Sequence, residues 1–174
     1  ESTRLLSSPD ADGAQIAFVS VRFGSWYTDL FTMSAAGGEQ TRILTAGGIE
    51  ETPTYSPDGR QIVLARVQGT HKNLFAVDPT GAGLTSLTAT QSDDRQPTFS
   101  PDGQRIAFAS RRDGHFEIYS MSSSGGAATK LTRKPVSQMP AYSPSGHLIA
   151  FSRGGSIYTM DANGASVTRL TNNT

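Results

Sequence analysis

Two histidines stand 44 residues apart, at positions 71 and 115. Neutral imidazole is the commonest metal ligand in proteins and a frequent general base, so an aligned pair is a candidate for metal binding or acid–base chemistry. A metal centre of this kind takes three or four protein ligands. The two histidines occupy the same position in two of four internal repeats, which are described below. The other two repeats hold residues there that do not complete such a set: Trp26 or Tyr27 in the first, and Gly154, Gly155 and Ser156 in the fourth. We therefore predict no catalytic residue and no metal ligand, and His71 and His115 remain candidates for ligand binding only.

Charged and aromatic side chains gather in the segments between apolar runs. An alternation of acidic and basic groups predicts recognition of a peptide or an acidic ligand, whereas arginine–carboxylate pairs that brace neighbouring repeats are the structural alternative. The aromatic cluster at 23–27 either anchors a partner or packs on the neighbouring repeat. With the histidines, the candidate ligand-binding residues are Arg22, Trp26, Tyr27, Glu50, Glu51, Arg66, His71, Asp93, Asp94, Arg111, Arg112, His115 and Arg153.

Composition excludes several classes of function. The 15 Lys and Arg balance the 15 Asp and Glu, so the basic excess that characterises a nucleic-acid binder is missing. No stretch approaches the roughly 18 apolar residues that insert into a membrane. There is no cysteine, and the sequence contains neither a Gly-x-Ser-x-Gly elbow nor a phosphate-binding glycine loop. We expect no cofactor, no nucleic-acid partner and no membrane insertion.

Internal repeats organise the chain. Three segments, 53–59, 97–103 and 140–146, share the pattern Pro-x-aromatic-Ser-Pro-Asp/Ser-Gly, and a weaker copy ends at Gly13. Their turn glycines, Gly59, Gly103 and Gly146, follow one another at steps of 44 and 43 residues. Each copy closes on a Leu-Thr pair, at 44–45, 87–88, 131–132 and 170–171. The chain is therefore four copies of one unit.

Each unit predicts four antiparallel strands. A short strand ends at the aromatic residue, Ser-Pro-Asp-Gly forms a hairpin whose glycine takes a positive φ, and two alternating strands and a short fourth strand follow. Units of about 40–45 residues with four strands are the blades of β-propellers. We predict an all-β, single propeller domain over 1–174, with four four-stranded blades at approximately 1–45, 46–88, 89–132 and 133–174. Ile106 and Phe108 are expected to be almost fully buried between blades.

The repeat resembles that of the TolB-like β-propeller family. The resemblance rests on Pro-x-aromatic-Ser-Pro-Asp-Gly, Ile-Ala-Phe-x-Ser-x-Arg, Ile-Tyr-x-Met and Arg/Lys-Leu-Thr, which the third copy matches over 99–132. It implies a non-catalytic scaffold that binds a protein or peptide through its loop face, and a periplasmic or exported location. The alternative that it implies is a polyuronate lyase-like or other metal-dependent carbohydrate-active enzyme, because such lyases carry the same type of repeat.

The number of blades leaves the closure of the ring open. A closed four-bladed ring, a fragment of a longer propeller and two chains that assemble eight blades are all compatible with four repeats. An open half-ring is expected to expose apolar faces of the first and last blades, near Ile16, Phe18, Ile149 and Phe151. We therefore favour self-association into an eight-bladed homodimer over a closed four-bladed monomer.

Overall fold

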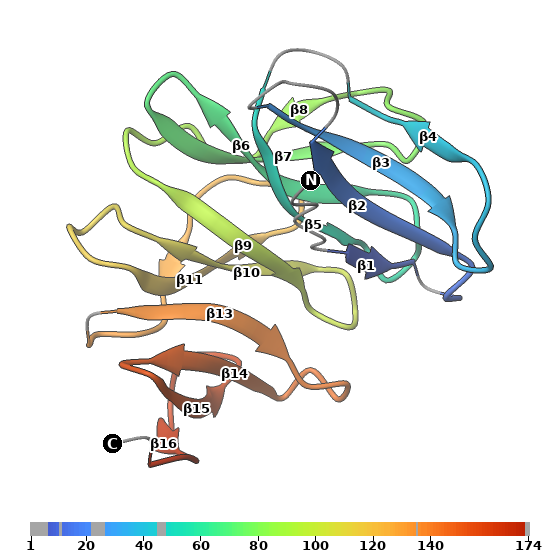
Figure 1. Cartoon of the computed structure of the whole chain (residues 1–174). Coiled ribbons are helices and arrows are strands. Elements are labelled where there is room, and N and C mark those ends of the chain that lie inside the picture. The colour runs from blue at the N-terminus through green and yellow to red at the C-terminus, as the bar shows by residue number, and fades with distance from the viewer. Residues whose placement is uncertain (1–6, 11, 22–26, 45–47, 135, 173–174) are drawn as a thin grey trace.

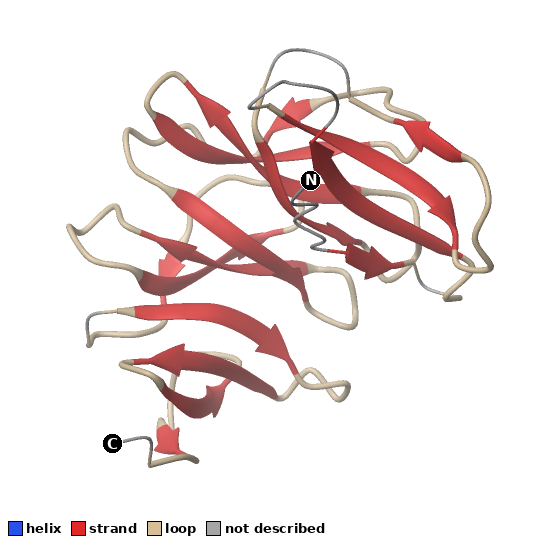
Figure 2. Ribbon diagram, in the orientation of Figure 1, coloured by secondary structure: helices blue, strands red, loops and turns tan. Residues whose placement is uncertain are grey.

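The computed structural model describes residues 7–10, 12–21, 27–44, 48–134 and 136–172. All regular elements in these ranges are β-strands (Figure 2). None of the described residues belongs to a helix of the length and apolarity that crossing a membrane requires.

The strands form four antiparallel sheets, and each sheet follows the order of the chain. The first blade comprises β1 (Ser7–Pro9), β2 (Gln15–Val21), β3 (Thr28–Ser34) and β4 (Gln40–Arg42). The second comprises β5 (Glu50–Tyr55), β6 (Ile62–Gln68), β7 (His71–Val77) and β8 (Thr85–Ser86). The third comprises β9 (Asp94–Phe99), β10 (Arg105–Ser110), β11 (Glu117–Ser122) and β12 (Thr129–Lys130). The fourth comprises β13 (Ser137–Tyr142), β14 (Leu148–Arg153), β15 (Ser156–Asp161) and β16 (Thr168–Arg169).

The blades fan out as an open arc, with the first and the fourth blade at its two ends (Figure 1). Their first strands are the inner ones: β1 packs near β5, β5 near β9, and β9 near β13. The fold class predicted from the repeats, a propeller of four four-stranded antiparallel blades, is confirmed.

The Ser-Pro-Asp-Gly hairpins have the predicted geometry. Gly59 and Gly103 have φ of 70° and Gly146 has φ of 75°, a region that residues with a Cβ rarely adopt. The serine and aspartate of the turn bond to one another, with the hydroxyl of Ser56 donating to Oδ1 of Asp58 over 2.6 Å. The same oxygen of Asp58 also accepts a hydrogen bond from the backbone amide of Arg60, so the turn satisfies its own polar groups.

The Leu-Thr pairs also have a local cause. In each of the last three blades the threonine hydroxyl accepts a hydrogen bond from a backbone amide of the third strand, that of Leu74, Ile118 or Ile157, at 2.9 Å. These threonines are Thr88, Thr132 and Thr171. The bond joins the end of each repeat to the strand that precedes its last turn, so the chain reaches the next blade from a defined point.

Apolar side chains fill the spaces between successive blades. One cluster joins the first and second blades, a second the second and third, and a third the third and fourth. Ile106 and Phe108 lie in the middle cluster and are 0% exposed, as predicted. Burial between blades, rather than within a separate core, therefore holds the arc together.

The prediction for the exposed apolar face of the last blade is wrong. Ile149 and Phe151 point toward the third blade and are buried. Successive residues of a strand alternate between its two faces, so the opposite face carries Ser152 and, in register with it, Ile157. In the first blade, Phe18 is also buried, and only Ile16 of the four residues is half-buried.

The face of the fourth blade that points away from the third blade is exposed instead. Ile157 is 42% and Leu170 is 58% exposed. Their counterparts in the third blade, Ile118 and Leu131, are buried against the fourth blade. The fourth blade thus leaves open the face that every preceding blade packs against its successor.

Candidate functional site

A cavity of about 920 Å³ lies where the inner strands meet. Residues of β5, β9 and β13 line most of it, and the ends of β2 and β3 complete the wall. Its surface is mixed, because the half-buried Glu51, Thr52 and Gln96 lie beside Met139, whose side chain is 62% exposed. The lining residues run along the inner strands, so the cavity lies on the inner side of the arc.

A strained backbone residue recurs at the cavity wall. Thr52, Gln96 and Met139 have φ of 49°, 57° and 53°, and each directly precedes the first proline of the repeat motif. The register of the inner strand shifts at the same place in all three blades, as in a β-bulge. A residue other than glycine in this backbone conformation costs on the order of 1–3 kcal/mol of folding free energy. Strain of this kind is concentrated at functional sites. The amide of Met139 donates to Oε1 of Gln96 over 3.0 Å, which joins two bulges across neighbouring blades.

Two predicted acidic residues pair with predicted arginines inside one blade. Glu50 begins β5 opposite Arg66 of β6, and Nε of Arg66 lies 3.3 Å from Oε1 of Glu50. Asp94 begins β9, and Nη2 of Arg112 lies 3.2 Å from its Oδ1. Both carboxyl side chains are almost fully buried. These arginines therefore brace the first strand of their own blade.

The other two predicted acidic residues also have cationic partners. Nζ of Lys72 lies 2.8 Å from Glu51, and Nη2 of Arg95 lies 2.9 Å from Asp93. All four side chains are about one quarter exposed. Lys72 and Arg95 were not predicted from the sequence, although each lies within a few residues of a predicted histidine or aspartate. Each of the four acidic candidates thus has a cationic partner within the protein.

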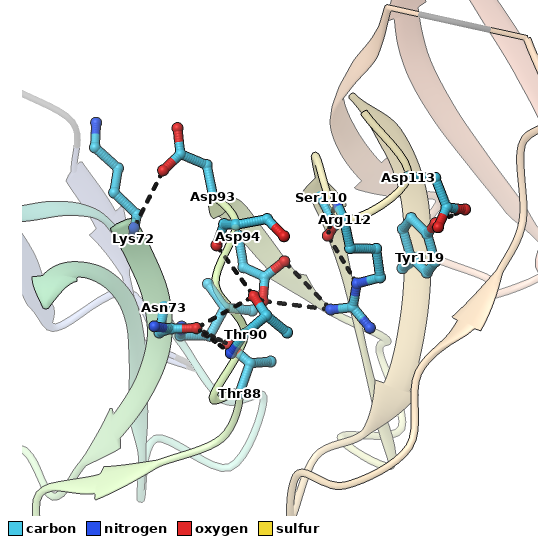
Figure 3. A network of polar contacts seen from close by, with 12 residues as sticks. Lys72, Asn73, Thr88, Thr90, Asp93, Asp94, Ser110, Arg112, Asp113 and Tyr119 are labelled. Atoms are coloured by element: carbon cyan, nitrogen blue, oxygen red, sulfur yellow. Dashed lines mark hydrogen bonds and ion pairs between the residues drawn. The ribbon is translucent and has the colours of Figure 1, made fainter. Parts of the chain in front are cut away.

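A polar network joins the second blade to the third (Figure 3). Oδ1 of Asn73 accepts the amide of Thr90 over 2.9 Å, and the Thr90 hydroxyl donates to Oδ2 of Asp94 over 3.1 Å. The amide of Lys72 donates to Oδ1 of Asp93 over 3.2 Å. The start of β7 is therefore tied to the start of β9, and the loop between the two blades is fixed at both ends.

The paired arginines also stack on aromatic rings of their own blade. The guanidinium of Arg112 lies 4.6 Å from the ring centre of Tyr119, and that of Arg66 lies 6.0 Å from Phe75. Arg153 repeats the arrangement in the fourth blade, at 4.9 Å from Phe151. A guanidinium over a ring face gains electrostatic attraction and loses rotational freedom, so the three side chains are held in place.

Glu50 is the residue whose ionisation the fold alters most clearly. Burial raises the pKa of its carboxyl to about 7, although the charge of Arg66 acts in the opposite direction. Neither carboxylate oxygen has a hydrogen-bond donor within bonding geometry. Gly48 covers the pair closely, since a Cβ at this position would lie 2.6 Å from both Oε1 of Glu50 and Nε of Arg66.

The two histidines lie at equivalent hairpins of the second and third blades. His71 begins β7 and is half-buried, and His115 is exposed in the loop between β10 and β11. Arg111 is exposed in the same loop and donates to the carbonyl of Gly114 over 3.3 Å. Across the described ranges, no group of three or more His, Cys, Asp or Glu side chains is gathered so that it could hold a metal ion.

The remaining candidates that the structure describes, Tyr27 and Arg153, belong to the first and the fourth blade. Tyr27 is 53% exposed beside the start of β3. Arg22 and Trp26 lie outside the described residues. Arg153 ends β14, and its Nε donates to the hydroxyl of Ser137 over 3.1 Å. The structure therefore pairs Glu50 with Arg66 and Asp94 with Arg112, whereas Arg153 bonds to Ser137, which is not a candidate.

Known proteins resemble part of this sequence, and others resemble its fold. A "Tol-Pal system protein TolB" of Francisella tularensis is 40% identical over 58 residues, which are 33% of this chain and 13% of that protein. The structure of a putative TolB from Agrobacterium tumefaciens superposes with a TM-score of 0.83 at 24% identity, and covers 92% of this chain and 62% of that one. The chain thus spans less than two thirds of these relatives.

A carbohydrate-active enzyme has the same fold. An oligogalacturonate lyase from Vibrio parahaemolyticus superposes with a TM-score of 0.73 at 14% identity, over 97% of this chain and 54% of that one. At this identity the likeness concerns the fold alone.

A family model matches the chain over its whole length. The model of the TolB beta propeller domain matches residues 1–174. This range includes all four repeats, and the four blades have the strand order that the repeats predict. The chain belongs to the TolB β-propeller domain family.

Proposed function

We propose that this domain binds a protein or peptide partner at the cavity on the inner side of the arc, and that it does so without catalysis. The observation that carries the proposal is the cavity of about 920 Å³, whose wall combines the exposed Met139 with polar side chains. Exposed apolar side chains beside oriented polar groups are typical of partner-binding surfaces. The three strained bulges at the same wall support the proposal, because they fix the direction of the inner strands there.

The relatives suggest the first partner to test. Those from Francisella are named for the Tol-Pal system, and we propose a Pal protein as the partner. Replacing Met139 with aspartate places a charge in the cavity and is expected to weaken Pal binding about tenfold or more, measured by isothermal titration calorimetry. Leu84→Asp makes the same chemical change at a residue 38% exposed on the outer side of the second blade, and it is expected to leave binding within about twofold. Absence of binding by the unmodified domain, or equal binding by both variants, would contradict the proposal.

The family and the structures of similar fold also bear on the location and on an alternative function. We propose a periplasmic or exported location, on the basis of membership in the TolB β-propeller domain family. The alternative function is a polyuronate lyase-like enzyme, which the shared fold of the Vibrio lyase supports. Stoichiometric metal together with uronate-oligomer cleavage that disappears in His71→Ala would favour this alternative over the binding module.

We also propose that the domain self-associates through the open face of the fourth blade. Ile157 and Leu170 expose apolar surface at positions that are buried in the third blade, and a second copy is the occupant that we favour. The eight-bladed dimer predicted from the repeats is an assembly of this type. Sedimentation at micromolar concentration is expected to give twice the chain mass for the unmodified domain and a monomer for Leu170→Glu. A stable species of 18.4 kDa for the unmodified domain would overturn this proposal.

A further inference from the structure

The second and third blades each supply an internal carboxylate to a stacked arginine. In the second blade Glu50, the first residue of β5, lies opposite Arg66 in the register of the sheet. In the third blade Asp94, the first residue of β9, is bound by Arg112 at 3.2 and 3.3 Å. The first residue of the inner strand thus neutralises the guanidinium that stacks on the aromatic residues of the same blade.

The fourth blade keeps the arginine and lacks the carboxylate. Ser137 begins β13 and lies opposite Arg153 in the same register as Glu50 and Arg66. The guanidinium of Arg153 lies 4.9 Å from Phe151 and 5.0 Å from Tyr158, and its Nε is held by the buried hydroxyl of Ser137. Within the part of the chain that the structure describes, no carboxylate forms an ion pair with Arg153. The side chain is therefore oriented as in the other blades, with its charge uncompensated.

The fourth blade is poor in acidic residues. After Glu117, the sequence contains Asp161 as its one acidic residue. Arg133 and Lys134 are exposed in the loop that leads to Ser137, at the same end of the blade as Arg153. Asp161 ends β15 in register with Leu148, at the opposite end of the sheet. The described part of the last blade thus places Arg133, Lys134 and Arg153 at this end and no acidic residue, while the buried Glu117 of the third blade is bonded to Thr132 and Lys130.

We propose that the loop end of the fourth blade binds a carboxylate from an acidic segment of a protein partner, with Arg153 as its anchor. The second and third blades identify the ligand chemistry, because the carboxylates of Glu50 and Asp94 occupy this position there. An arginine that is already stacked and held by a hydrogen bond loses little freedom when it binds a carboxylate. Arg133 and Lys134 attract the remaining charges of the segment. The inference deepens the proposed function, since it names the chemistry of one contact with the partner.

The inference is tested with a simple acidic probe. Hexaglutamate, blocked at both ends, is titrated into the domain at about 50 mM salt, and hexaglutamine is the uncharged comparison. We expect Arg153→Gln to weaken hexaglutamate binding about tenfold or more. Ser137→Glu recreates the Glu50–Arg66 pair in the fourth blade and is expected to cause the same loss with the arginine retained. Arg105→Gln removes the same charge from the opposite end of the third blade and is expected to change binding by less than about twofold.

The outcomes separate this inference from the proposed function. Equal binding by the unmodified domain, Ser137→Glu and Arg105→Gln would overturn the inference, and so would binding of hexaglutamine with the same affinity. Ser137→Glu keeps the test valid if Arg153→Gln fails to fold. Loss of Pal binding in Met139→Asp together with unchanged hexaglutamate binding in Ser137→Glu would support the proposed function and reject this site. Hexaglutamate binding that depends on Arg153, with no binding of Pal, would support this site and reject Pal as the partner.

Discussion

Replacing Phe108 with alanine is expected to lower the free energy of unfolding by about 3–5 kcal/mol. The side chain is 0% exposed and lies in the apolar cluster between the second and third blades, with Val63 and Leu74 of the second blade. Its ring stacks on Tyr119, with the two ring centres 6.1 Å apart. Truncation removes these contacts on both sides of an interface that cannot collapse, because the neighbouring strands are fixed by their own hydrogen bonds.

The loss is measured by urea denaturation, with the transition followed by circular dichroism. Val167→Ala is the control, since Val167 is 44% exposed beyond the third strand of the fourth blade and its truncation is expected to cost less than about 0.5 kcal/mol. A loss for Phe108→Ala of the same size as in the control would mean that the two blades are not packed as described. A reduced slope in urea together with a small loss would point to separate unfolding of the blades.

The blades could be predicted from the sequence because each local signal agrees with the others. The aromatic residue before Ser-Pro-Asp-Gly marks the end of the inner strand, and β5, β9 and β13 end at Tyr55, Phe99 and Tyr142. The turn glycines take positive φ as expected. Alternation of large and small apolar residues places Ile106 and Phe108 against the preceding blade. Repetition of the same pattern four times then determines the number and the order of the sheets.

The bulges of the inner strands could not be predicted in the same way. Thr52, Gln96 and Met139 differ in size and polarity, and none is a glycine or an asparagine, the types that favour positive φ. The proline that follows each of them was visible, and proline inside a strand indicates a bulge or an edge. The inner strands β5, β9 and β13 nevertheless begin before these prolines, at Glu50, Asp94 and Ser137.

The sequence indicates which charged residues are candidates for the site, but it does not indicate which of them pair. Glu50, Asp94, Arg66 and Arg112 were all identified, but their partners depend on register and on stacking, which a single sequence does not give. The pairing of Lys72 with Glu51 could not be predicted, because the two residues are 21 positions apart and meet only through the register of the blade. The open face at Ile157 was missed because the prediction considered the face of the strand that carries the larger side chains.

Glu50 is expected to make the domain less stable as the pH rises from about 4.5 to about 8. The pKa of its carboxyl is raised by burial from 4.5 to about 7 in the folded protein, so the folded state holds the proton more tightly than the unfolded state. A group of this kind contributes its full stability below the unfolded pKa and loses it as the pH passes through the folded pKa. The free energy of unfolding is therefore expected to fall by up to about 3 kcal/mol on account of this residue.

Glu50→Gln removes the titrating proton and keeps the shape of the side chain, so it isolates this contribution. Denaturation with urea at a series of pH values is expected to show that the variant gains on the unmodified domain by about 2–3 kcal/mol between pH 5 and pH 8. The other titratable groups are the same in both proteins, so their effect cancels in the difference. Glu51→Gln, which removes a half-buried carboxyl paired with Lys72, is the matched control. Parallel curves for Glu50→Gln and the unmodified domain would mean that Arg66 stabilises the buried carboxylate fully, and that the pair under Gly48 is a permanent brace rather than a group poised near neutral pH.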